Sequence, residues 1–361
     1  MSEFKNRKIQ RSMSVDLTSM VNSGLSTRTS ISRSLNSSPS RISITPSSSE
    51  ENTPRNFLKL LKNRSLSKII FNISTNKSDQ QIDPLKVQFH KKIGGGGCSE
   101  VFAGSVNNLG LAIKYYHQPI NNDNDNDDLM REIYILNGLN HPRIIHYIGF
   151  SIEKNQKLLM FMELCQGTIH ELSSESSIDI LEIFKQVAEG LVYLHSQNVI
   201  HRDIKSENIF YSIQLNRETL KQEFDFKIGD FDTAIKCIDQ CQIEDVPNLG
   251  TLEFRAPEII RPSYSERVCY TDKVDNWAFG MLIFELVFND VPYRYDFGMN
   301  FNAIERAIVS GIKPTVSKRK MKRKSARLYE LYDFCLCIDP IVRPNSQQIL
   351  DFILDKKMLK S

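Results

Sequence analysis

The sequence predicts an α+β fold in which a region of short strands precedes a longer region of helices. Three observations predict this order. Strand-type residues flank a glycine-rich turn within residues 87–114. Apolar residues recur at helical spacing within residues 181–194. Residues 277–288 are almost all apolar but fall short of the roughly 18 residues of a membrane span, so they predict a buried helix.

Between these regions the pattern changes several times. Residues 129–139 have one apolar face and predict a helix. Residues 144–145 and 158–164 are apolar and predict buried strands. The short polar stretch that follows, at residues 163–167, is suited to a hinge between two lobes.

Composition and charge set the first part of the chain apart. Residues 1–79 carry 13 Lys/Arg and 5 Asp/Glu, a net charge of +8, whereas the remaining residues carry 33 and 38, a net charge of −5. Residues 1–54 contain 21 Ser/Thr and few large apolar residues, which predicts a disordered basic tail. A phosphorylatable regulatory tail, an inert linker and a mitochondrial transit peptide are the alternatives for this tail.

Residues 55–84 are predicted to be a basic amphipathic segment and linker. Apolar residues interleave with lysine and arginine over residues 55–73. Such a helix could contact a membrane surface or a partner, or pack on the chain's own folded domain. A second basic run, at residues 318–324, could dock an acidic partner or act as a nuclear signal, with a solvated loop as the alternative.

Cysteine usage and charge exclude several classes of protein. The seven cysteines are an odd number without zinc-site spacing, which predicts reduced thiols and a cytoplasmic protein, with a nuclear location as the alternative. No apolar run is long enough for a transmembrane segment. The positive charge lies in the tail and not on the folded region, so no nucleic-acid partner is expected.

The most specific motif is H-R-D-x-K-x-x-N at residues 201–208. Asp203 is a candidate acid/base group, Lys205 a cation and Asn208 an amide, at a spacing that suits phosphoryl transfer. Further motifs stand in a fixed order around it: a glycine loop at 94–97, Lys114 at a strand end, Glu132 in a helix, Asp-Phe-Asp at 230–232, Ala-Pro-Glu at 256–258, and the segments 275–280 and 339–344.

In this order, the motifs resemble those of the eukaryotic protein kinase superfamily over residues 87–357. The resemblance implies a two-lobed protein kinase fold: a small antiparallel β-sheet lobe with one main helix at 87–162, a hinge at 163–168, and a larger, mostly helical lobe at 169–357. The phrases at 190–195 and 337–340 are most similar to the tyrosine-kinase-like group of Ser/Thr kinases.

The resemblance also implies a reaction and its cofactors. The γ-phosphoryl group of ATP would pass to Ser/Thr hydroxyls of protein substrates, with Mg²⁺ or alternatively Mn²⁺ as the metal. Asp203 would accept or orient the proton of the hydroxyl, and Lys205 would neutralise charge on the transferring group. Asn208 and Asp230 would hold the metal. Lys114, positioned by Glu132, would bind the α- and β-phosphates.

The remaining nucleotide-binding residues are also implied by the resemblance. Adenine would lie between Val101 and Ala112 on one side and Phe210 on the other. The full predicted set is Ile93, Gly94, Gly95, Gly96, Gly97, Cys98, Ser99, Glu100, Val101, Ala112, Lys114, Glu132, Met162, Glu163, Cys165 and Phe210. Within it, Glu163 and Cys165 would contribute hinge backbone groups, and Met162 would gate the space behind the adenine.

Substrate type and stability follow from other matched positions. Lysine at position 205 is typical of kinases that act on Ser/Thr, and Thr251 would face Asp203 in support of that specificity. Glu258 and Arg343 would form a buried ion pair, whose loss destabilises the larger lobe.

Two residues depart from the family pattern. Ser99 stands at the third glycine of the loop, and Asp232 stands where Asp-Phe-Gly has glycine. Asp232 is predicted to restrict flipping of its segment and to add negative charge near the metal. These departures support the alternative function, a pseudokinase that acts as a nucleotide-binding signalling scaffold.

The segment between Asp230 and Glu258 has only two hydroxyl side chains, Thr233 and Thr251. No activating phosphorylation site is evident there. Arg202 could pair with a phosphate on this segment. We nevertheless predict that the activation segment is ordered without phosphate, with Glu244 or Asp245 acting as a fixed anion.

Overall fold

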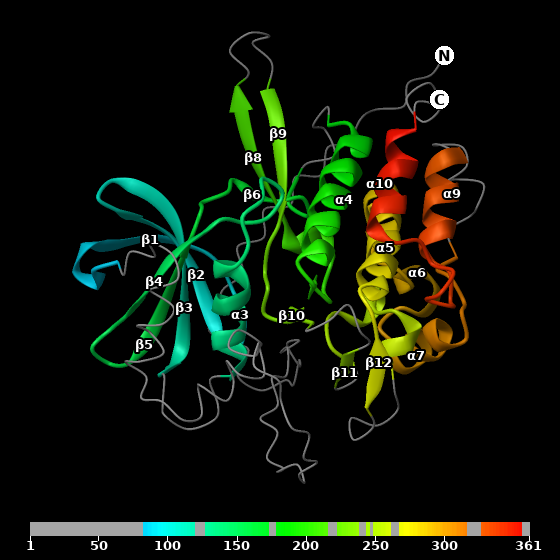
Figure 1. Cartoon of the computed structure of the whole chain (residues 1–361), viewed down its shortest axis with the longest axis horizontal. Helices are drawn as coiled ribbons and strands as arrows, with labels where there is room; N and C mark the ends of the chain where they lie inside the picture. The colour runs from blue at the N-terminus through cyan, green and yellow to red at the C-terminus, as the bar shows by residue number, and fades with distance from the viewer. Residues whose placement is uncertain are drawn as a thin grey trace, which may run out of the picture.

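The computed structural model describes residues 82–119, 127–172, 178–215, 222–237, 243–245, 248–260, 267–315 and 326–355. The predictions for residues 1–54, for nearly all of 55–84 and for the basic run at 318–324 lie outside these ranges. Figure 1 shows a β-sheet with one helix beside it on one side of the molecule and a group of helices on the other. This arrangement confirms the predicted two-lobed α+β fold.

The smaller lobe is an antiparallel sheet with the strand order β1-β2-β3-β5-β4. Its strands are β1 (Val87–Gly95), β2 (Ser99–Val106), β3 (Leu109–Pro119), β4 (Tyr147–Ile152) and β5 (Lys157–Met162), preceded by the turn η1 (Pro84–Lys86). Helix α3 (Asp127–Asn137) is the helix of this lobe. In β3, Leu111 and Ile113 are buried on one face, so the alternate residues Ala112 and Lys114 point to the other face.

One predicted strand is wrong. Residues 144–145 form no strand: Ile144 makes only an isolated bridge to Ile228, and Ile145 donates its N–H to the Ile228 carbonyl at 2.9 Å. The strand begins later, at Tyr147, and β5 ends at Met162 rather than Leu164. The two isoleucines are buried because they bridge to the larger lobe, so their apolar character indicated burial but not sheet pairing.

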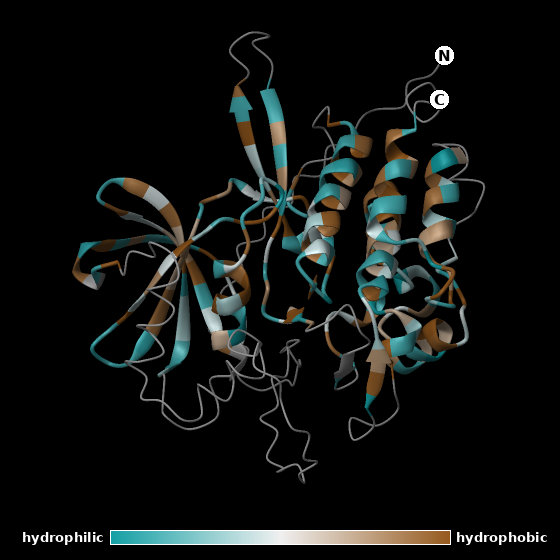
Figure 2. Cartoon of the chain, viewed as in Figure 1, coloured by the Kyte–Doolittle hydropathy of each residue, from teal (hydrophilic) through white to brown (hydrophobic). Residues whose placement is uncertain are grey.

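The larger lobe is built around α5 (Lys273–Phe288), which is buried on nearly all sides, as its apolar sequence predicts. Helix α5 packs against α9 (Ala326–Cys335), and α4 (Ile180–Ser196) packs against α10 (Ser346–Leu354). The short helices α6 (Arg294–Phe297) and α7 (Phe301–Val309) lie nearby. Figure 2 shows hydrophobic and hydrophilic residues together along α4 and α10, which is typical of helices with one solvent face.

Short strand pairs position the loops between the lobes. Strands β6 (Gly167–Thr168), β8 (Ile209–Leu215) and β9 (Gln222–Ile228) form a small sheet, and two further pairs are β7 (Val199–Ile200) with β10 (Ile235–Lys236) and β11 (Ile243–Asp245) with β12 (Val268–Tyr270). The turns are η3 (Ser206–Asn208), η4 (Leu252–Phe254) and η5 (Pro257–Ile259). The β8–β9 register places Ile209 opposite Ile228, which brings the end of the 201–208 motif beside the 230–232 motif.

A buried ion pair fixes the later part of this lobe. The Arg343 guanidinium donates to both carboxylate oxygens of Glu258, at 2.6 and 3.0 Å. The Arg343 side chain is fully buried and its guanidinium lies over the Trp277 ring. The predicted pair is therefore present, and it connects two segments 85 residues apart in the sequence.

Two negative predictions concern membranes and disulfides. Among the described helices, none combines the length and the apolar character that crossing a bilayer requires. The six cysteines in the described ranges form no disulfide with one another.

Candidate active site

Lys114 lies at the centre of the contacts between the sheet and the activation segment. Its Nζ donates to Glu132 Oε1 at 2.7 Å, so the predicted pair between strand β3 and helix α3 is present. Both side chains are almost completely buried. Burial alone would lower the pKa of Lys114, but the facing carboxylates, Glu132 foremost, hold that pKa well above its usual range. Lys114 is therefore a permanent cation.

Tyr116 is a residue of the site that sequence reasoning missed. Its hydroxyl donates to Glu132 Oε2 at 2.6 Å, which fixes the carboxylate oxygen that Lys114 does not use. The available signal was its position, two residues after Lys114 on the same strand, because alternate residues of a strand share a face.

Strand register places several predicted adenine contacts on the face that carries Lys114. Val101 pairs with Lys114, and Ala112 pairs with Met162. Directly opposed residues of neighbouring strands share a face, and so do alternate residues of one strand. Glu100 therefore points to the opposite face, where it accepts from Lys92 Nζ at 2.6 Å. The structure thus places Val101, Ala112 and Met162 together with Lys114 and leaves the Glu100 side chain elsewhere.

The glycine turn between β1 and β2 shows two kinds of glycine. Gly95 has φ +151°, and a Cβ there would meet Ser99 O at 3.0 Å, so the turn itself requires glycine. A Cβ on Gly96 would meet nothing within 4 Å, so no protein atom requires glycine at that position. A site that must admit phosphate oxygens would explain Gly96.

The remaining loop residues close this turn. The Ser99 carbonyl accepts from Gly96 N at 2.8 Å, and the Cys98 carbonyl accepts from His117 N at 3.0 Å. Ser99 itself is buried and has no positive φ, so serine at the third glycine position causes no backbone strain. Ile93 lies in β1, where its side chain is about half exposed.

In the hinge, the backbone and the side chain of Glu163 have different partners. Glu163 N donates to the His146 carbonyl at 3.0 Å, which leaves the Glu163 carbonyl as the group for a ligand. The Glu163 carboxylate accepts from Lys227 Nζ at 2.7 Å, so its side chain joins the lobes. On the other side, a Cβ on Gly229 would lie 2.7 Å from the Phe210 ring, so glycine before Asp230 makes room for Phe210.

A buried carboxylate of helix α5 binds the backbone of the 201–208 loop. Asp275, in the first turn of α5, accepts from His201 N at 2.9 Å and from Arg202 N at 2.7 Å. Arg202 has φ +70°, so these two bonds stabilise an unusual backbone turn. Burial would raise the pKa of Asp275, but a hydrogen bond with His195 and the surrounding charges lower it overall.

Three neighbouring groups fix the carboxylate of Asp203. Its carboxylate accepts from Thr251 N at 2.8 Å and Asn208 Nδ2 at 3.0 Å, and Lys205 Nζ lies 3.0 Å away. Burial would raise the pKa of Asp203, but Lys205 and Thr251 outweigh it and lower the pKa. Lys205 also donates to Thr251 Oγ1 at 2.8 Å, so the predicted approach of Thr251 to Asp203 is present.

Gly250 explains how the activation segment comes so close. It has φ +78°, and a Cβ there would lie 2.2 Å from the Arg202 carbonyl oxygen. Only glycine allows Thr251 to pack directly against the 201–208 loop.

A second missed residue supports the same loop from the core. Glu285 of α5 accepts from Ser206 N at 3.0 Å and from Ser206 Oγ at 2.6 Å. The signal in the sequence was a glutamate inside an otherwise apolar helix, since buried carboxylates are rare without a polar partner.

Asn208 and Asp230 lie together, as the resemblance implies. Gly229 N donates to the Asn208 carbonyl at 2.9 Å, which links the two motifs by backbone. Both side-chain bonds of Asn208 use Nδ2, so its amide oxygen is the group left for a ligand. Asp230 has φ +62°, and its neighbour Phe231 is fully buried edge-on against His201, with ring centroids 4.9 Å apart. A carboxylate and an amide oxygen are hard donors that suit Mg²⁺.

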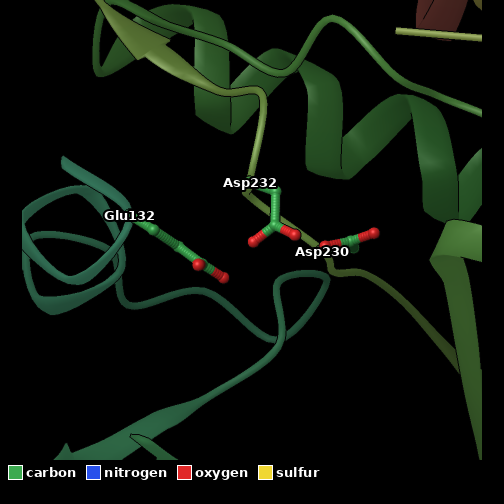
Figure 3. A group of neighbouring side chains, drawn as sticks. All are labelled: Glu132, Asp230 and Asp232. Carbon is green, nitrogen blue, oxygen red and sulfur yellow. The ribbon is translucent and has the colours of Figure 1, made fainter. Parts of the chain in front are cut away.

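Three carboxylates gather around Lys114. One oxygen from each of Glu132, Asp230 and Asp232 lies within 4.8 Å of the others, and Figure 3 shows Asp232 between the other two. Lys114 Nζ contacts Asp232 Oδ1 directly and lies 3.7 Å from Asp230 Oδ1. Asp232 has no positive φ, so aspartate replaces the expected glycine without backbone strain. Asp232 thus places its carboxylate beside Asp230, one of the two residues predicted to hold the metal.

Arg202 binds the activation segment through a second acidic contact. Its Nη1 donates to Asp245 Oδ2 at 2.5 Å and to the Tyr270 hydroxyl at 2.8 Å, and its Nε donates to the Thr233 carbonyl. Burial raises the pKa of Tyr270 to about 12, so this hydroxyl keeps its proton. Of the two predicted anions, Glu244 and Asp245, Asp245 is the one that contacts Arg202, and it lies in strand β11.

Comparison with known proteins agrees with this geometry. The protein kinase domain family matches residues 87–352, roughly three quarters of the chain. The chain belongs to the protein kinase family. Its Lys114–Glu132 pair, 201–208 loop and 230–232 motif all fall within the matched region.

Several relatives of this kinase are described as Ser/Thr kinases. The serine/threonine-protein kinase pakC of Dictyostelium discoideum is 31% identical over 278 residues, which cover 74% of this chain and 54% of pakC. STE20 of Saccharomyces cerevisiae is 26% identical over 72% of this chain and 26% of its own length. STY17 of Arabidopsis thaliana is 24% identical over 78% of this chain and 46% of its own length. This chain thus spans between about a quarter and about half of these relatives.

Proposed function

We propose that this protein kinase transfers the γ-phosphoryl group of ATP to Ser/Thr hydroxyls of proteins. The observation that carries the proposal is the position of Asp203. Its carboxylate is buried, ionised and fixed by Lys205, Asn208 and Thr251. A carboxylate in this state can accept and orient the proton of an incoming hydroxyl group.

Other residues of the site would bind the phosphates and the metal. Lys205 lies beside Asp203 and would face charge that develops on the transferring phosphoryl group. Lys114 is the cation for the α- and β-phosphates, since Glu132 holds its Nζ on the face that carries Val101 and Ala112. Asn208 and Asp230 would hold Mg²⁺, which neutralises phosphate charge when bound.

The contact between Lys205 and Thr251 supports specificity for Ser/Thr. Lys205 Nζ donates to Thr251 Oγ1 at 2.8 Å, which joins the 201–208 loop to the activation segment beside Asp203. The relatives pakC, STE20 and STY17 carry the name serine/threonine-protein kinase. The phrases at 190–195 and 337–340 further support placing the chain in the tyrosine-kinase-like group.

We also infer that the activation segment needs no phosphorylation. The Asp245 carboxylate already accepts a hydrogen bond from Arg202, and strand pairing of β11 with β12 holds Asp245 in place. Of the two hydroxyl residues in the segment, Thr251 binds Lys205 and Thr233 donates to the His201 carbonyl at 2.9 Å.

The direct test is transfer of labelled γ-phosphate from ATP with Mg²⁺ to a generic basic protein. We expect phosphoserine or phosphothreonine as product, and a loss of roughly a hundredfold or more in Asp203→Asn. Phosphotyrosine as the only product would overturn the specificity. Mg-ATP binding without any transfer would favour the alternative scaffold function, which the contact between Asp232 and Lys114 would then explain.

A further inference from the structure

The contact between Asp232 and Lys114 has no counterpart in a segment with glycine at position 232. Lys114 Nζ already donates to Glu132, and Asp232 Oδ1 takes a second direct contact with the same atom. An ammonium group has three N–H donors, so these two carboxylates occupy most of its capacity. The two carboxylates therefore compete with any further anion for Lys114.

The two partners of Lys114 differ sharply in exposure. The Glu132 side chain is 2% exposed and is further held by the Tyr116 hydroxyl. The Asp232 side chain is 52% exposed, and its carboxylate contacts Lys114 Nζ and lies beside the carboxylate of Glu132. Glu132 is thus a fixed partner, whereas Asp232 can rotate into solvent at small cost.

The backbone around Asp232 would remain in place during such a rotation. The Asp232 carbonyl accepts from Arg131 Nη2 at 3.3 Å, and the preceding Phe231 is fully buried. Only the side chain needs to move to release Lys114.

The phosphates of a bound nucleotide would compete with Asp232 for Lys114, and the negative charges of the two groups would repel each other. The phosphates of ATP are anions, and Asp232, Asp230 and Glu132 already place three carboxylates beside one lysine. Like charges at this separation repel, so phosphate binding and the Asp232 contact oppose each other.

We propose that Asp232 acts as a latch, which holds Lys114 in the nucleotide-free kinase and which the phosphates of bound ATP must displace. The latch selectively weakens binding of phosphate-bearing nucleotides and leaves binding of the nucleoside unchanged. It rests on the proposed function only in that Lys114 receives nucleotide phosphates.

The test is calorimetric titration of the full chain with two probes, ATP in EDTA and adenosine. Asp232→Asn keeps the size of the side chain but removes its charge, and Asp232→Gly removes the side chain. We expect both variants to bind ATP about fivefold more tightly than the wild type. Adenosine has no phosphate, so its affinity should be the same in all three proteins.

The matched control is Asp333→Asn. Asp333 contacts Lys313 Nζ at 2.5 Å, and its side chain is 53% exposed, so it resembles Asp232 in partner and exposure but lies on α9. Its substitution should change neither affinity.

Three results would overturn the latch. The first is ATP binding that is unchanged in both Asp232 variants, which would show no competition, or weaker, which would assign Asp232 a supporting role in nucleotide binding. The second is an equal shift for ATP and adenosine, which indicates a general change of the site. The third is no binding of either probe by any of the proteins, which would overturn the proposed function together with the latch. Wild type that transfers phosphate but shows either of the first two results would leave the proposed function standing.

Discussion

Lys114 and Arg202 are two buried cations that bind carboxylates of the same segment, yet the two contacts differ in kind. Their side chains are 6% and 2% exposed. The partner of Arg202, Asp245, is 20% exposed and lies in a strand, whereas Asp232 at Lys114 is 52% exposed. The comparison indicates that burial of the anion distinguishes a permanent structural pair from a contact that a ligand can replace.

The largest effect on activity is expected at Lys114, the cation whose contact with Asp232 a ligand can replace. Lys114→Arg keeps a positive charge beside Glu132 but replaces a compact ammonium with a planar fork. We expect kcat/KM to fall about a hundredfold or more, because the α- and β-phosphates lose their positioning contact. Steady-state kinetics and thermal unfolding measure the two effects separately. An Arg variant with more than half of the wild-type activity would show that Lys114 does not position the nucleotide.

The corresponding change in the permanent pair of Arg202 and Asp245 is Asp245→Asn. It leaves the Arg202 guanidinium buried without its anion, with the Tyr270 hydroxyl, the Thr233 carbonyl and a neutral amide oxygen as acceptors. We expect a loss of about 2 kcal/mol in the free energy of unfolding. Denaturant unfolding measures it, with the exposed Asp290→Asn as a control that should change stability by less than about 0.5 kcal/mol. Equal stability of the two variants would remove the distinction between the two cations.

Acid sensitivity should also follow the permanent contacts. The pKa of Asp275 is lowered in the folded protein, so its contribution to stability is present above the unfolded-state value of ~3.9. It is lost as the pH falls through the lowered folded-state value. Asp275→Asn should therefore cost about 2 kcal/mol at pH 7, and its difference from wild type should shrink below about pH 4. Unfolding curves between pH 3 and pH 7 test this, and a difference that widens on acidification would contradict it.

The smallest effect is expected at Tyr116. Tyr116→Phe removes the hydroxyl bond to Glu132 Oε2 but keeps the ring. We expect about 1 kcal/mol lower stability and nearly unchanged transfer, since Lys114 still holds the other oxygen. A tenfold loss of transfer with unchanged stability would instead make Tyr116 a positioning residue for Lys114.

Pairs formed by motif residues could be predicted from the sequence, because the ordered motifs resemble those of the protein kinase superfamily, in which these residues meet. This holds for Lys114 with Glu132 and for Glu258 with Arg343. The two-lobed fold could be predicted for the same reason.

Contacts that depend on the convergence of distant segments were not predictable in this way. Glu285 meets Ser206 across 79 residues, and Asp232 meets Lys114 across 118. The error at residues 144–145 has a similar cause, because burial against a distant strand resembles sheet pairing in an apolar pattern. In each case the residue type indicated burial or charge, and only the fold determined the partner.

The central claim is that this kinase is built to transfer phosphate with an activation segment held by Asp245 and not by an added phosphate. The most direct measurement is the initial rate of phosphate transfer by protein that is shown by intact mass to carry no phosphate. We predict a linear rate from the first turnover, with no lag. Transfer that begins only after the activation segment has been phosphorylated would contradict the claim.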